Sequence, residues 1–170
     1  LCVIKNSLIN FIKITQKVKD LLLEEQLFEK TDEKIFKRLN NIIEKFGILE
    51  VLNKGFKIRN THFEIYIKQP SSNQNKEHLE EFKRNEFSIV RQLYFKENSK
   101  LSIDSVLFLN GIPIITIELK NQLTNQNIEN AIQQYRNDRD PNETLLNFKR
   151  CIVHFGVDND EVVMTTKLNN

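Results

Sequence analysis

Asp104, Glu118 and Lys120 are the residues whose types and spacing could do chemistry. Glu118 and Lys120 are two apart in an apolar, β-branched stretch, so on a strand both point to one face, which Thr116 shares. Two carboxylates side by side repel each other unless a cation neutralises them, and Mg²⁺ prefers oxygen ligands of this kind. Mg²⁺ can activate a water at a phosphate, and a lysine can hold that water or neutralise the charge that develops. The pattern therefore predicts Mg²⁺-dependent phosphodiester hydrolysis, and the alternative is a solvated strand edge with a surface ion pair.

The position of Asp104 depends on the turn that joins the two strands. Asn110-Gly111 is a strong hairpin signal between residues 101–109 and 112–120. A three-residue loop would place Asp104 opposite Glu118, whereas a two-residue loop would place it opposite residue 117. The two carboxylates therefore meet only if the loop has three residues or if the hairpin contains one bulge.

The remaining elements must support this hairpin. Apolar residues at helical spacing in residues 4–29 predict a first helix, and Thr31 and Gly47 are expected to begin and end a second one. A single strand is expected at 56–68 and a helix at 77–92, although residues 87–93 could form a strand. After the hairpin, the pattern predicts a helix at 126–139 and strands at 151–157 and 161–166. His154, inside one of these strands, is expected to be a satisfied partner near the core.

Composition excludes several classes of protein. The 170 residues are 39% hydrophobic and 28% charged, and their longest apolar runs are too short to cross a bilayer. Two cysteines exclude a disulfide scaffold, and four glycines leave no phosphate-binding loop. The net charge of +2 gives no strong grip on DNA. No signal peptide precedes the first helix, so we expect a cytoplasmic protein and a fragment of a longer chain.

A resemblance to a known family rests on residues beyond the two acids. The series Asn110-Gly111-Ile112-Pro113, Glu118-Leu119-Lys120-Asn121 and Gln134-Tyr135-Arg136-Asn137-Asp138-Arg139 resembles the PD-(D/E)xK nuclease core of the restriction and translocation (R) subunit of type I restriction–modification enzymes. The likeness covers roughly residues 48–168. It implies a restriction-endonuclease-like α/β fold, in which a mixed central sheet is flanked by helices. Residues 1–47 would form a helical segment packed on a core of residues 48–170.

The resemblance also implies a function and partners. The chain would be a type I site-specific deoxyribonuclease domain in which Asp104 and Glu118 hold Mg²⁺ and Lys120 assists the attacking water. Double-stranded DNA and the modification and specificity subunits would be its partners, and ATP would serve only motor domains that these residues lack. Gln134, Tyr135, Arg136 and Arg139 are candidate DNA contacts, and Glu80 or Glu86 could add a third acid. The alternatives are an inactive docking module with the same fold and a stand-alone repair or mobile-element nuclease.

Overall fold

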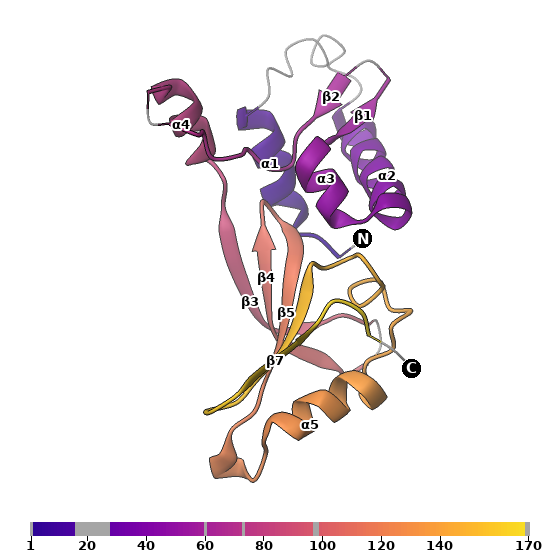
Figure 1. Cartoon of the computed structure of the whole chain (residues 1–170). Helices are drawn as coiled ribbons and strands as arrows, with labels where there is room; N and C mark the ends of the chain where they lie inside the picture. Colours follow the sequence, from indigo (N-terminus) through magenta and orange to yellow (C-terminus); the bar gives the residue numbers. More distant parts are fainter. Residues whose placement is uncertain (1, 16–27, 60, 73, 97–98, 169–170) are drawn as a thin grey trace. The chain divides into compact units, whose positions relative to one another are not determined.

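The computed structural model describes residues 2–15, 28–59, 61–72, 74–96 and 99–168 (Figure 1). Beyond the first two residues, the contacts divide the chain into two units. One comprises Val3–Phe87 together with the hairpin turn Leu109–Ile112, and the other comprises Ser88–Phe108 and Pro113–Asn170.

The first unit is built on amphipathic helices. Helices α1 (Lys5–Thr15) and α2 (Phe28–Phe46) each bury one apolar stripe. Short helices α3 (Ile48–Lys54) and α4 (Lys76–Phe82) complete the helical part. The buried residues of the two long helices are Leu8, Ile9, Phe11, Ile12, Ile35, Leu39 and Ile43. The second half of the stripe predicted over 4–29 falls on residues 16–27, which lie outside the described residues.

Three expectations for the first unit need correction. Thr31 does not begin the second helix, because α2 already includes Phe28. The end of α2 at Phe46, directly before Gly47, is as predicted. The single strand expected at 56–68 is a small hairpin of β1 (Phe56–Ile58) and β2 (Thr61–Phe63), with Arg59 at positive φ in its turn. The helix expected at 77–92 ends at Phe82, and the strand considered as the alternative for 87–93 is confirmed as β3 (Phe87–Tyr94).

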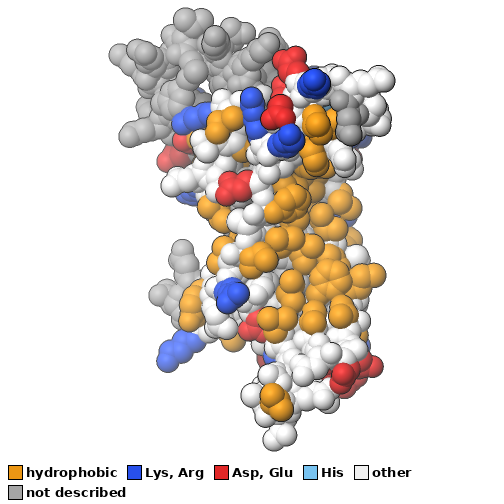
Figure 2. Space-filling model, turned by 90° about the vertical axis from the view of Figure 1, so that its left-hand side faces the viewer, with side chains coloured by type: hydrophobic (Ala, Val, Ile, Leu, Met, Phe, Trp, Pro, Cys, Tyr) orange, Lys and Arg blue, Asp and Glu red, His pale blue; other side chains and the backbone are white. Residues whose placement is uncertain are grey.

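A five-stranded mixed sheet carries most of the second unit. Its order is β3, β4 (Ser102–Leu109), β5 (Ile112–Leu119), β6 (Val153–Val157) and β7 (Val162–Thr165). β6 runs parallel to β5, and β7 returns antiparallel to β6. The edge strand β3 leaves Ile89 and Tyr94 more than 60% exposed, and Figure 2 shows hydrophobic side chains exposed on this side of the sheet. The mixed α/β class is confirmed, and the fold is consistent with a restriction-endonuclease-like one.

The connection between β5 and β6 contains the helix that covers the site. The 3₁₀ turn η3 (Gln122–Thr124) leads to α5 (Ile128–Gln133), which begins with a reciprocal capping box between Asn127 and Asn130. The helix widens into a π-helical turn, η4 (Gln134–Asp138), so it ends one residue before the predicted end at Arg139. α5 packs on β6 and β7, where Gly156 leaves room for the side chain of Ala131 (Figure 1).

The β4–β5 hairpin turns through two residues. Asn110 and Gly111 have φ angles of 50° and 79°, as a type I′ turn requires. The Asn110 amide donates to the Ile65 carbonyl at 2.8 Å and accepts from the Glu86 N–H at 2.7 Å. A side chain at Gly111 would meet the Ile4 carbonyl at 2.5 Å. The turn is therefore fixed within the first unit.

No helix among the described residues is long and apolar enough to span a membrane.

Candidate functional site

Asp104 and Glu118 lie next to each other although the hairpin turn has two residues. The Leu119 N–H donates to Asp104 Oδ2 at 2.8 Å, which places the Asp104 carboxylate beside the end of β5. Burial along β4 changes phase at Asp104 and Ser105, since Ile103 and Val106 on either side are both buried. One extra residue at this point gives the slip of a β-bulge. The structure thus brings the two carboxylates together by the second of the two routes considered from the sequence.

Glu118 is buried, and its pKa reflects that burial. The side chain is 0% exposed, and Arg139, itself 3% exposed, donates to its Oε1 from Nε at 2.8 Å, while Nη2 lies 2.8 Å from the same oxygen in an ion pair. Desolvation raises the pKa of Glu118 to about 7, although Arg139 opposes this. The neighbouring Asp104 carboxylate raises the pKa further, because it repels the charged form and can accept a hydrogen bond from the protonated form. The other oxygen, Oε2, is buried and receives no hydrogen bond. Arg139 therefore holds one oxygen of this carboxylate, whereas the other oxygen has no donor.

Lys120 lies directly beyond β5 on the same face as Glu118. Its backbone N–H donates to the Val157 carbonyl at 2.8 Å, which extends the pairing with β6. Its Nζ donates to Oε1 of Gln134, at the start of η4. Gln134 thereby fixes the side chain of Lys120, two residues beyond Glu118.

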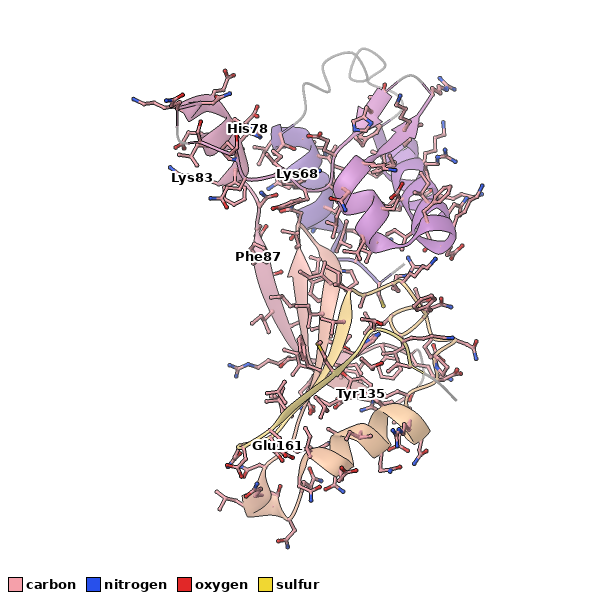
Figure 3. The ribbon with its side chains drawn as sticks, in the orientation of Figure 1. Lys68, His78, Lys83, Phe87, Tyr135 and Glu161 are labelled. Carbon is pink, nitrogen blue, oxygen red and sulfur yellow. The ribbon has the colours of Figure 1, made fainter. Side chains whose placement is uncertain are left out.

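A buried polar chain continues along the same face of the sheet. Thr116 Oγ1 lies 2.9 Å from Tyr135 Oη and 2.7 Å from His154 Nδ1. Thr116 and His154 are direct partners in the parallel β5–β6 register. Burial lowers the pKa of His154 to about 4 and, as the main cause, raises that of Tyr135, so both are neutral near pH 7. Tyr135, labelled in Figure 3, extends from η4 toward the sheet and fixes this turn over the site.

The predicted DNA contacts are placed unevenly. Arg136 is exposed, whereas Gln134 and Tyr135 are bonded within the site. Arg139 does not share a helix face with Tyr135, because it follows η4 in an extended conformation with φ −111° and ψ 97°. That conformation lets Arg139 reach Glu118, a contact the sequence analysis missed. The only sign of this contact in the sequence was an acid, Glu118, within an apolar strand, where a buried carboxylate needs a cation.

The upstream acids make their described contacts within the first unit. Glu80 forms an ion pair with Lys83 at 2.6 Å on the first unit. Glu86 is exposed, belongs to the same unit, and uses its backbone N–H to hold Asn110.

The residues present fit a hard divalent cation. No three His, Cys, Asp or Glu side chains converge as a metal site in the part of the chain that the structure describes. A cation here would have the carboxylates of Asp104 and Glu118, with water or a phosphate as its other ligands. Mg²⁺ is commonly bound in this way, through one or two carboxylates, because it keeps several waters. The buried Oε2 without a donor is the observation that favours such an ion.

Comparison with known proteins gives one family. The family described as type I restriction enzyme R protein N terminus matches residues 7–170. A relative from Methanocaldococcus jannaschii carries the provisional name of type I restriction enzyme MjaVIIIP endonuclease subunit. It is 29% identical over 147 residues, which cover 79% of this chain and 14% of the relative. The chain thus spans about a seventh of that relative's length. No solved structure matches.

Proposed function

Because the chain belongs to the family of type I restriction enzyme R protein N termini, we propose that it is a Mg²⁺-dependent endonuclease domain that hydrolyses DNA phosphodiester bonds. The family supports a restriction endonuclease role, and the site supports the chemistry. The chain covers 14% of the relative. We therefore assign ATP-driven translocation, as part of this proposal, to other parts of a longer subunit. Double-stranded DNA and the modification and specificity subunits are the proposed partners.

The observation that carries the proposal is the adjacency of the Asp104 and Glu118 carboxylates at the end of β5, with Lys120 two residues beyond Glu118 in the chain. The Leu119 N–H fixes Asp104, Arg139 fixes Glu118, and Gln134 fixes Lys120. An isolated surface ion pair contributes little to stability, whereas each charged group here has a hydrogen-bond partner of its own. A preorganised set of charges is what stabilisation of a phosphate transition state requires.

Each residue has a distinct task in this proposal. Asp104 and Glu118 would hold Mg²⁺, which supplies an acidified water and stabilises negative charge on the phosphate. Lys120, held by Gln134, orients the attacking water through its Nζ and offsets the charge that develops on the phosphate oxygens. Arg136, which is exposed on η4, would contact a neighbouring phosphate in this proposal.

The test uses the full-length subunit assembled with its modification and specificity subunits. We expect Glu118→Gln and Lys120→Ala to lower DNA cleavage at least about 100-fold while ATP hydrolysis stays unchanged. Glu161→Gln is the matched control, because Glu161 lies exposed in the β6–β7 turn (Figure 3). The subunit with this substitution should cleave DNA normally. Normal cleavage by Glu118→Gln would refute the proposal.

The alternative of an inactive docking module predicts a different result from the same variants. The buried Glu118–Arg139 ion pair favours this alternative, since such a pair can also serve structure alone. In that case Glu118→Gln would prevent assembly of the complex and reduce ATP hydrolysis along with cleavage. Gel filtration of each assembled variant separates this outcome from loss of chemistry.

A further inference from the structure

Arg139 binds Glu118 in an unusual way. An arginine commonly pairs with a carboxylate through two parallel hydrogen bonds, one to each oxygen. Here Nε and Nη2 both lie 2.8 Å from the same oxygen, Oε1. The other oxygen, Oε2, is buried without a donor. The guanidinium thus engages one oxygen of the carboxylate and leaves the other oxygen without a donor.

Arg139 is itself held in place from two further directions. Its Nη2 donates to the Ser102 carbonyl at 2.9 Å, at the start of β4. Its guanidinium lies 5.6 Å from the centre of the Phe95 ring. With 3% of its side chain exposed, Arg139 cannot swing out to a DNA phosphate without breaking all of these contacts. The interaction therefore fixes the orientation of Glu118 before any ligand arrives.

From this geometry we propose that Arg139 is a positioning residue, which holds Oε1 of Glu118 so that Oε2 is available to a divalent cation shared with Asp104. This inference rests on the proposed function and gives Arg139 a role other than DNA contact. Groups that orient a metal-binding carboxylate without touching the metal typically change metal affinity 10- to 100-fold when they are replaced.

A competing role for Arg139 would have the opposite effect on metal affinity. A buried cation beside two carboxylates could simply take the place of a metal ion. In that case its removal would free both oxygens of Glu118, and Mg²⁺ would bind more tightly. Mg²⁺ affinity, measured apart from cleavage, therefore distinguishes positioning from substitution.

The experiment is a calorimetric titration of the 170-residue chain with Mg²⁺. We expect Arg139→Lys and Arg139→Gln each to weaken Mg²⁺ binding by about 10- to 100-fold, because neither can place two donors on Oε1. Arg91→Lys and Arg91→Gln are the matched controls, since Arg91 is exposed on β3, and they should bind as the parent chain does. Unchanged or tighter binding by the Arg139 variants would overturn the inference.

A milder variant covers the case in which the Arg139 variants do not fold, as judged by circular dichroism. Phe95→Leu keeps every charge and removes only the ring beside the guanidinium. We expect it to weaken Mg²⁺ binding by severalfold, and an unchanged affinity would contradict the inference.

The parent chain separates this inference from the proposed function. It is titrated alone and with a short DNA duplex that has a non-hydrolysable backbone. If it binds no Mg²⁺ in either case, the proposed function fails and the inference fails with it. If the parent binds Mg²⁺ and the Arg139 variants bind equally well, only the inference fails.

Discussion

Two buried groups on the same face of the sheet should oppose each other in the pH dependence of stability. The pKa of Glu118 is raised from its ordinary value of 4.5 to about 7. Between these values the unfolded chain releases a proton that the folded chain keeps, so the free energy of unfolding falls as pH rises. The pKa of His154 is lowered from 6.5 to about 4. Between those values the unfolded chain takes up a proton that the folded chain refuses, so the free energy of unfolding falls as pH drops.

Each contribution is on the order of 3 kcal/mol when its whole pH window is crossed. The windows overlap from about pH 4.5 to 6.5, and there the two slopes nearly cancel in the parent chain. Glu118→Gln removes one slope, and we expect its stability relative to the parent to rise by about 3 kcal/mol between pH 4.5 and 7.5. His154→Asn removes the other, and its relative stability should rise by a similar amount as pH falls from about 7 to 4.

The assay is urea unfolding followed by circular dichroism at a series of pH values, in buffer with a chelator. Differences from the parent chain remove the contribution of every group that the variants share. Glu161→Gln, which changes an exposed carboxylate, should follow the parent curve. A difference between Glu118→Gln and the parent that stays constant with pH would refute the reasoning, and so would slopes of the same sign in both variants.

Three smaller predictions concern other parts of the fold. Asn110→Ala should lower the free energy of unfolding by at least about 2 kcal/mol in urea titrations, because it leaves buried backbone groups of the first unit without partners. Gly156→Ala should lower the free energy of unfolding by about 1–3 kcal/mol, since its new Cβ would lie 2.9 Å from that of Ala131; an unchanged melting temperature would contradict the close packing of α5. Cys151, whose pKa burial raises to about 12, should resist a thiol reagent at pH 8 until urea unfolds the chain, and rapid labelling, followed by mass spectrometry, would show that the core opens.

The hairpin was predictable because its signals are local. Asn110-Gly111 specifies the turn, and the β-branched residues that follow specify a strand. Reliance on local pattern also explains why a single strand was wrongly predicted over 56–68. Alternation over 56–68 could not show that the chain reverses at Arg59, since a single residue at positive φ leaves the pattern intact.

The contacts of the site were harder to predict because they are tertiary. Placing Asp104 beside Glu118 depended on a bulge that no turn residue marks in β4. Reaching Glu118 from Arg139 depends on where the π-helical turn ends, and the helical pattern alone continues through it. Local sequence therefore predicted the strands and the residue types of the site, whereas the partners that orient them required the structure.

The buried amide of Asn110 has a consequence for how the chain folds during its synthesis. The Asn110 side chain hydrogen-bonds to the backbone of Ile65 and of Glu86. The first unit therefore cannot form these two hydrogen bonds until the ribosome has synthesised the hairpin turn. Contacts that join distant parts of a chain form late, because the intervening segment must first be ordered. The segments around Ile65 and Glu86 therefore complete their hydrogen bonds only after the hairpin turn has been made. A nascent chain that stops before the turn would leave these backbone groups without partners, as substrates for chaperones and proteases.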